Sequence, residues 1–146
     1  MKITFYGTKD HYGCFSNFSA HGVTIDGAYW PTTEHFFQAQ KFVGTEHEKR
    51  IQEAASPMKA AQMGRQRTRP LRADWEAVKD DVMRRAVLAK FSQHEDAREV
   101  LLGTGEAEII ENAPRDYYWG CGCKGTGKNM LGKILVEVRE ALRDPA

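Results

Sequence analysis

The sequence predicts a single α+β domain, predominantly helical with a small sheet, that spans residues 1–146. Two observations carry this prediction. Short runs rich in β-branched and aromatic residues, bounded by glycine, fill the first third of the chain, and helical spacing of apolar residues dominates the remainder. A chain of 146 residues can bury roughly two-thirds of its unfolded surface in one core.

Four short strands are expected. Residues 3–6, 23–25 and 28–30 are each bounded by a glycine, at Gly7, Gly22 and Gly27. Residues 108–111 place two isoleucines between two glutamates and favour a fourth strand. These runs account for the small sheet.

Helices are expected over most of the remaining chain. Thr32 and Thr33 supply a hydroxyl cap, and Glu34 an acid near the positive end of the dipole, for a helix that runs to about residue 43. Ser56 followed by Pro57 marks the start of another helix. Further helices are expected at residues 46–55, 74–91, 95–102 and 129–142, the last after a glycine-rich loop at residues 120–127.

Composition excludes several classes of protein. The opening residues lack the apolar core of a signal peptide, and no later run approaches the roughly 20 apolar residues of a membrane span. We therefore expect a cytoplasmic protein that does not contact a membrane. The three cysteines, Cys14, Cys121 and Cys123, are expected to be reduced, and neither they nor the five histidines show metal-ligand spacing.

The charge balance leaves only local sites for anions. Lys and Arg total 21 against 20 Asp and Glu, so the net charge of +1 creates no global field that attracts nucleic acid. Five cations do gather within a short segment after residue 58, and this segment is either a phosphate site or a solvated connector between helices. They are Lys59, Arg65, Arg67, Arg69 and Arg72.

The first predicted helix carries a candidate for chemistry. Glu34, Gln38 and Lys41 are spaced by four and three residues, so they project from one line along the helix. Their neighbours are mostly aromatic, which indicates a buried helix whose polar stripe faces a cleft. A lysine that is desolvated there loses its proton more readily, and its neutral amine can attack a sugar C1 or a carbonyl. The alternative is an exposed pair, Glu34 and Lys41, bridged by Gln38.

A second candidate lies near the C-terminus. Asp116 precedes Tyr117, Tyr118 and Trp119, whose rings suit a nucleobase, although a core strand would explain the rings equally well. The spacing of Gly122, Gly127 and Lys128 fits most of a P-loop. Asn129 stands where a P-loop has the Ser or Thr that binds magnesium, so a nucleotide triphosphatase is not favoured.

Several motifs together resemble the NADAR family, also called the YbiA-like family. They occur in the family's order over nearly the whole chain. The motifs are Phe15-Ser16-Asn17-Phe18, the segment from Trp30 to Phe42, Arg69-Pro70-Leu71-Arg72-Ala73-Asp74-Trp75, Asp116-Tyr117-Tyr118-Trp119-Gly120, and Gly127-Lys128-Asn129-Met130-Leu131-Gly132.

The resemblance implies an N-glycosidase that needs no metal or other cofactor. Two substrates are associated with the family, namely ADP-ribosylated guanine in DNA or RNA and the ribosylamino-pyrimidine phosphates of riboflavin synthesis. Each joins ribose C1 to an amine of a guanine-like ring. We expect the first substrate, whose cleavage reverses ADP-ribosylation and counteracts a partner ADP-ribosyltransferase toxin.

The resemblance also implies roles for individual residues. Lys41 would form a Schiff base with the opened ribose, with Lys90 as the alternative, and Glu34 would act as general acid and then base. Asp116 would orient the ribose or support proton transfer. Substrate-binding residues would be Phe15, Asn17 and Gln38 in the walls, Trp75 or Trp119 stacked on the base, and Arg72, Gly127, Lys128 and Asn129 on phosphate.

Three other readings stay open from the sequence. Glu34 or Asp116 could activate water directly against an oxocarbenium-like sugar, without covalent capture. A module that binds ADP-ribose or NAD without cleaving it would use similar pocket residues. Binding of nucleic acid through the arginine segment would show a steep salt dependence.

Overall fold

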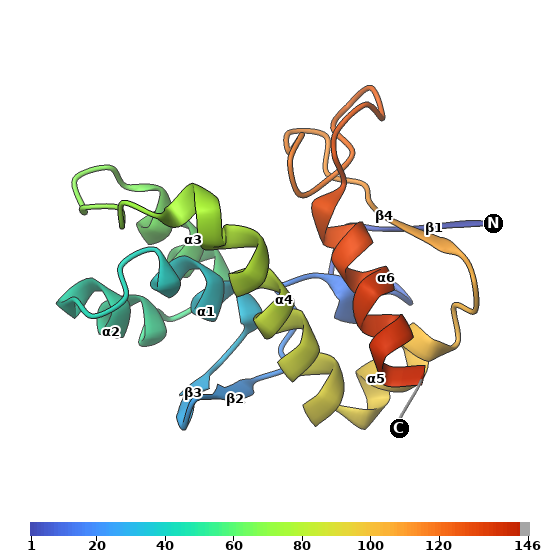
Figure 1. Cartoon of the computed structure of the whole chain (residues 1–146), viewed down its shortest axis with the longest axis horizontal. Coiled ribbons are helices and arrows are strands. Elements are labelled where there is room, and N and C mark those ends of the chain that lie inside the picture. The colour runs from blue at the N-terminus through green and yellow to red at the C-terminus, as the bar shows by residue number, and fades with distance from the viewer. Residues whose placement is uncertain (144–146) are drawn as a thin grey trace. The chain divides into compact units, whose positions relative to one another are not determined.

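Helices predominate in the computed structural model, which describes residues 1–143 (Figure 1). The predicted α+β class is confirmed, with two two-stranded sheets in the described part of the chain. The helices are α1 (Thr33–Gln40), α2 (Glu46–Gln52), α3 (Pro57–Arg65), α4 (Trp75–Gln93), α5 (Glu95–Leu102) and α6 (Met130–Arg143). The strands are β1 (Lys2–Phe5), β2 (Val23–Ile25), β3 (Ala28–Trp30) and β4 (Glu108–Glu111), and η1 (Gly13–Phe15) is a short 3-10 helix that the sequence did not predict.

Hydroxyl caps begin three of the helices. The side chains of Thr32, Thr45 and Ser56 accept from the backbone N–H groups of His35, His47 and Lys59, which starts α1, α2 and α3. The helix α1 ends at Gln40, three residues before its predicted end. There Lys41 N donates to Gln38 O and Phe42 N to Ala39 O, so the chain tightens into i to i−3 turns.

The chain divides into two compact units, and the first to consider is Asn17–Lys90. In this unit α1 packs against α2 and α3, and every residue of α1 is buried. Strands β2 and β3 form an antiparallel hairpin with Val23 opposite Trp30. Its turn places Asp26 and Gly27 at φ values of 52° and 81°, the left-handed conformation that a tight two-residue hairpin requires.

The other unit joins Met1–Ser16 to the chain from Phe91 onward. Here β1 and β4 pair in parallel, with Ile3 opposite Ile109, and α6 packs against β4. Asn129 covers the free edge of β4, because its side chain accepts from Glu111 N at 3.0 Å and donates to Ile109 O at 2.9 Å. Asn129 thus replaces a neighbouring strand at this edge.

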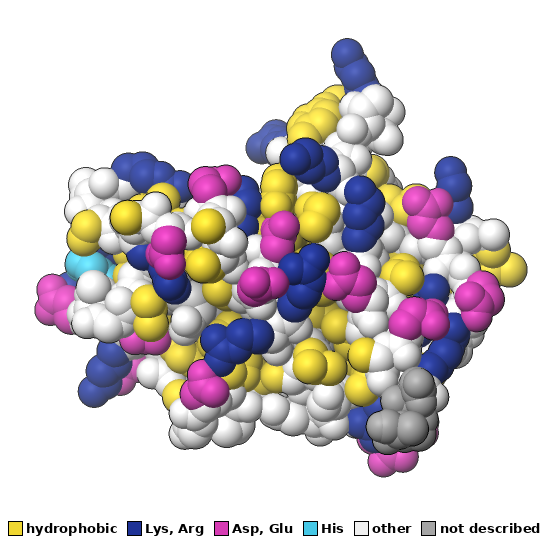
Figure 2. Space-filling view, in the orientation of Figure 1, with side chains coloured by type: hydrophobic (Ala, Val, Ile, Leu, Met, Phe, Trp, Pro, Cys, Tyr) yellow, Lys and Arg dark blue, Asp and Glu magenta, His cyan; other side chains and the backbone are white. Residues whose placement is uncertain are grey.

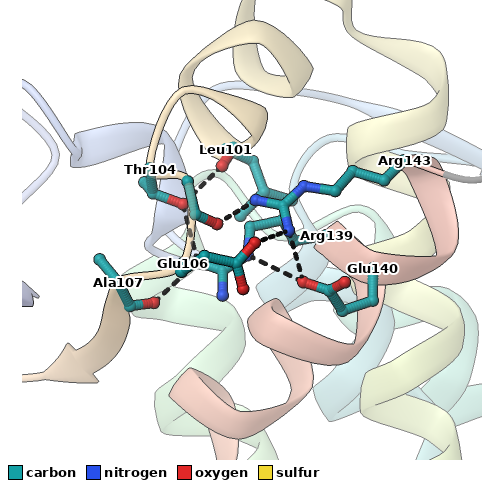
Figure 3. Close-up of polar contacts among 8 residues, drawn as sticks. Leu101, Thr104, Glu106, Ala107, Arg139, Glu140 and Arg143 are labelled. Atoms are coloured by element: carbon teal, nitrogen blue, oxygen red, sulfur yellow. Dashed lines mark hydrogen bonds and ion pairs between the residues drawn. The ribbon is translucent and has the colours of Figure 1, made fainter.

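A buried arginine fixes the end of α5 to α6 (Figure 3). Arg139 is 2% exposed and donates to Thr104 Oγ1 at 2.9 Å and to Ala107 O at 2.8 Å. Close by, Arg143 donates to Glu106 and Glu140, both at 2.8 Å. The bonds of Arg139 Nη1 offset part of the cost of burying this guanidinium, and its Nε lies 3.6 Å from Glu140 Oε1.

The distribution of charged side chains and the polarity of the helices agree with the composition. Lys and Arg side chains are intermixed with Asp and Glu over the face shown in Figure 2. Within residues 1–143 we find no helix whose length and apolar character would let it cross a bilayer. The predicted domain range, 1–146, ends in three residues that lie outside the described part of the chain.

Candidate active site

The polar stripe of α1 is buried. Glu34, Gln38 and Lys41 are 8%, 5% and 8% exposed, so the alternative of an exposed, bridged pair is wrong. Gln38 Nε2 donates to Glu34 Oε2 at 2.7 Å, one helical turn away. A carboxylate, an amide and an amine therefore follow one another along one buried line that runs over α1 to its C-cap residue, Lys41.

The start of α1 is held by Asn17. The backbone N–H of Glu34 donates to Asn17 O at 3.1 Å, and the hydroxyl of Thr33 donates to Asn17 Oδ1 at 2.8 Å. Asn17 is itself buried, and its amide nitrogen faces the sulfur of Met83 at 3.5 Å. These contacts make Asn17 a support for Glu34, whereas its predicted contact with substrate stays a prediction.

Lys41 occupies a dry, aromatic environment. Its Nζ donates to Gly64 O at 3.3 Å and lies 5.9 Å from the ring centroids of both Phe37 and Trp75. Those two rings pack edge to face at 5.1 Å. Among the described residues Lys41 forms no ion pair with a carboxylate. One carbonyl and two aromatic rings contact the charged group directly, and Glu34 attracts it without forming an ion pair.

This environment favours the neutral amine. The pKa of Lys41 is lowered from its ordinary value of 10.5 to about 8, chiefly by burial and next by the nearby charge of Arg67, while Glu34 acts in the opposite direction. Desolvation therefore outweighs the attraction of the acid. A substantial fraction of Lys41 carries a free lone pair at slightly alkaline pH, which is what a nucleophilic lysine requires.

The lowered pKa makes Lys41 a cost to stability at neutral pH. Below pH 8 both folded and unfolded states hold the proton and the cost is present in full. Between pH 8 and 10.5 only the unfolded state holds it, so the free energy of unfolding rises with pH across this window. We expect Lys41→Met to raise that free energy by roughly 1–3 kcal/mol at pH 7, and by little above pH 10.5.

Urea unfolding of both proteins at pH 7 and at pH 10.5 measures this effect. Lys49→Met on α2 is the matched control, since Lys49 is exposed and its loss should leave stability nearly unchanged. A Lys41→Met protein that is less stable than the parent chain at pH 7 would show that the ammonium stabilises the fold.

Gln38 has one buried acceptor without a partner. Its Oε1 has no hydrogen-bond partner within residues 1–143. It lies against Gly64 in α3, where an added Cβ would overlap the Gln38 side chain. A substrate hydroxyl or amine that donates to Oε1 would relieve the cost of this unpaired oxygen.

Two residues of this site, Gly64 and Phe37, were missed from the sequence. Gly64 marked only the end of α3 there, whereas the structure uses its carbonyl to hold Lys41 and its missing side chain to admit Gln38. From the sequence, Phe37 was interpreted as a core residue. Nothing in the sequence indicated its contact with Lys41, since the ring could have packed on any neighbouring element.

Lys90, the alternative nucleophile, lies deeper in the same unit. It is 1% exposed on α4, and its Nζ donates to Ser19 Oγ at 3.2 Å. Lys41 is the C-cap residue of the helix that carries Glu34, whereas Lys90 lies on α4. The placement on one helix with an acid favours Lys41.

Arg72 and Trp75 have strong internal partners. The guanidinium of Arg72 forms a bidentate pair with Asp74, at 2.6 and 3.0 Å, and also reaches Gln40 O at 3.3 Å. The backbone N–H of Arg72 donates to Lys41 O at 3.0 Å. Trp75 is only 6% exposed. Arg72 therefore anchors its loop to the end of α1, and Trp75 forms the wall beside Lys41.

The remaining predicted residues belong to the other unit and are described separately. Asp116 is half-buried and accepts with Oδ1 from the backbone N–H groups of Tyr118, at 3.0 Å, and Trp119, at 2.8 Å. These bonds shape the turn that presents Trp119, whose side chain is half-buried. Its partial exposure makes Trp119 the better candidate of the two tryptophans for stacking on a base.

The predicted phosphate loop uses its backbone internally. The N–H groups of Gly127, Lys128 and Asn129 donate to the carbonyls of Cys121, Tyr117 and Gly120 at 2.7, 2.8 and 3.0 Å. They cannot also point at a phosphate, so the loop is not a P-loop cradle. Lys128 is exposed, with its ammonium 5.4 Å from the ring centroid of Tyr118, so its side chain can meet an anion.

Phe15 lies in an aromatic cluster of the same unit. Its ring is 1% exposed and packs against Phe5, Tyr12 and Phe91 at centroid distances of 5.7, 5.4 and 5.9 Å. This is a core position, and the predicted contact of Phe15 with substrate remains a prediction.

All three cysteines are free thiols, as expected.

Comparison with known proteins assigns this geometry to a family. The NADAR domain matches residues 4–143. The protein N-glycosidase YbiA of Escherichia coli is 52% identical over 140 residues, which are 96% of this chain and 88% of that protein. An N-glycosidase of Nostoc punctiforme is 52% identical over 147 residues, covering 99% of this chain and 94% of that protein.

A solved structure and a plant protein extend the comparison. The NMR structure of the Escherichia coli protein YbiA matches this fold with a TM-score of 0.90 at 51% identity, covering 98% of this chain and 87% of that chain. The chloroplastic riboflavin biosynthesis protein PYRR of Zea mays is 41% identical over 155 residues. That match covers 96% of this chain but 25% of the maize protein.

Proposed function

The chain belongs to the NADAR domain family, and from this premise we propose that it is an N-glycosidase that hydrolyses the bond between ribose C1 and an exocyclic amine of a guanine-like base. Its substrate is ADP-ribosylated guanine in DNA or RNA, so the reaction reverses ADP-ribosylation. An ADP-ribosyltransferase toxin would be the source of that substrate. The names of the bacterial relatives, both N-glycosidases, support the reaction class.

The observation that carries this proposal is the dry amine of Lys41 on the same buried helical line as Glu34. Structural lysines are usually exposed, and burying one without an ion pair costs stability. A pKa lowered to about 8 in an aromatic niche suits a nucleophile and serves no evident purpose in folding. Perturbed amines of this kind are typical of enzymes that form Schiff bases.

The proposed reaction proceeds by transfer of C1 between two amines. Glu34 donates a proton as the ribose ring opens, and the neutral Nζ of Lys41 adds to C1. Glu34 then passes a proton from the cationic Nζ to the base amine, the bond from C1 to that amine breaks, and C1 remains joined to Lys41 as a protonated Schiff base. Glu34, now ionised, accepts a proton from the water that adds to C1, and Lys41 is released with the free sugar. The balance is one glycoside and one water to one amine and one sugar.

A second substrate is favoured by the maize relative. Its name places it in riboflavin biosynthesis, and it is 41% identical over 96% of this chain. A ribosylamino-pyrimidine phosphate carries the same bond between ribose C1 and an amine of a guanine-like ring. The same Lys41 and Glu34 would cleave it by the same steps.

Parallel assays of the two substrates test the proposal. The intact chain is incubated with an oligonucleotide that carries ADP-ribosylated guanine and, separately, with a ribosylamino-pyrimidine phosphate, and the released sugar is measured by chromatography. We expect release of ADP-ribose from the oligonucleotide. Release from the pyrimidine alone would replace the first substrate by the second. Recovery of both substrates intact, while they bind, would contradict an N-glycosidase and indicate a binding module.

A further inference from the structure

The arginines at the end of α3 and in the loop after it differ in whether their guanidinium groups are paired. Arg72 is paired with Asp74, and the guanidinium of Arg69 donates to Met63 O and to Gln66 Oε1. Arg65 and Arg67, by contrast, form no ion pair with an acid among the described residues. Two guanidinium groups in this segment therefore remain available to an external anion.

Arg67 is held beside the proposed nucleophile. Its Nη1 donates to Gly64 O at 3.3 Å, and the same oxygen accepts from Lys41 Nζ at 3.3 Å. Two positive groups thus converge on one carbonyl in the last turn of α3. The negative end of a helix dipole amounts to about half an elementary charge, so it compensates only part of this positive charge.

The convergence is not an ordinary surface arrangement. Like charges that share one acceptor repel, and Arg67 is exposed, so its side chain could turn toward solvent. One of the five N–H donors of the Arg67 guanidinium is bound to Gly64 O, and others can still reach an oxyanion. A dianion between Arg65 and Arg67 would supply the missing negative charge.

We propose that Arg67, assisted by Arg65, binds the phosphate of the sugar substrate and thereby selects phosphorylated glycosides over phosphate-free ones. This inference rests on the proposed function for the identity of the sugar. Guanidinium groups bind phosphate through two parallel N–H bonds, which fixes direction as well as charge. The shared carbonyl of Gly64 then sets the position of the phosphate relative to Lys41. Arg72, which the resemblance implies for this role, is paired with Asp74, and its contact with phosphate stays a prediction.

Binding of inorganic pyrophosphate to the intact chain tests the site without any turnover. We expect Arg67→Gln to weaken binding at least about tenfold and Arg65→Gln to weaken it less, measured by calorimetry at low salt. Arg67→Lys should restore part of the affinity. The control is Arg50→Gln on α2, because Arg50 is exposed and paired with Glu46, and its loss should leave affinity unchanged. Equal pyrophosphate affinity in the Arg67→Gln and parent proteins would overturn the proposal.

Kinetics then connect the site to the substrate. With a phosphorylated N-riboside, Arg67→Gln should raise KM about tenfold or more, whereas the phosphate-free riboside should show only the smaller loss of activity that follows when the pKa of Lys41 rises without Arg67. Equal losses on both ribosides would contradict selection by phosphate. If no glycoside is cleaved by the parent chain, the proposed function fails while the pyrophosphate result still decides the anion site.

A phosphate group could also belong to a nucleic-acid backbone. An unmodified oligonucleotide provides the comparison, since it carries phosphodiesters and no ribosylated amine. Loss of oligonucleotide binding in Arg67→Gln with unchanged pyrophosphate binding would overturn the assignment to a sugar phosphate. Loss of pyrophosphate binding with unchanged oligonucleotide binding supports it.

Discussion

Replacing Lys41 by methionine is expected to lower kcat by roughly 10³-fold or more, because the proposed reaction needs the amine of Lys41 to form the bond to C1. Methionine keeps the length and the apolar stem of lysine. The substitution removes the buried charge and should leave the fold intact. Lys41→Arg should be equally inactive, since arginine stays protonated. Release of sugar under single-turnover conditions measures the loss.

The matched control for Lys41 is Lys79→Met. Lys79 lies near enough to affect the pKa of Lys41 and pairs with Glu76 at 2.6 Å, yet it has no proposed bond to substrate. Its loss should change kcat only a few-fold.

In the parent chain kcat/KM should rise with pH through about 8, as Lys41 loses its proton.

Trapping with borohydride identifies the nucleophile directly. Reduction of the Schiff base during turnover should leave the sugar on the peptide that contains Lys41. An adduct on Lys90 would transfer the role to that residue. Turnover without any adduct, together with an active Lys41→Met protein, would favour direct attack by water.

Replacing Glu34 by glutamine should lower kcat by about 10² to 10⁴-fold, which is the usual contribution of a general acid and base. The amide has the same shape, and its oxygen can still accept from Gln38 Nε2, so stability should change little. Glu48→Gln on α2 is the control, because Glu48 also accepts from a glutamine, Gln40 Nε2, and lies in the same unit.

The leaving group distinguishes acid catalysis from simple positioning. Two ribosides are compared, one whose amine is a good leaving group and one whose amine is a poor leaving group. The first needs less help from an acid, so Glu34→Gln should reduce its rate of bond cleavage less than that of the second. The difference is measured as the ratio of kcat/KM values for the two ribosides. An equal loss on both would mean that Glu34 acts only through the position of Gln38 or Lys41.

Local sequence determined most of the secondary structure and the membership of the family. Hydroxyl caps at Thr32, Thr45 and Ser56 act through bonds to residues two or three positions away, so their effect is readable from the chain alone. The same holds for the line of Glu34, Gln38 and Lys41, because helical geometry brings residues four and three apart onto one face.

Only the tertiary structure decided what surrounds that line. The burial of the stripe, the lowered pKa of Lys41 and the carbonyl of Gly64 depend on the packing of α1 against α3, 23 residues further along the chain. The different states of Arg67 and Arg72, and the use of Asn129 at the edge of β4, likewise depend on partners distant in sequence. A spacing rule reports which side chains share a face, whereas desolvation and pairing depend on every element that approaches that face.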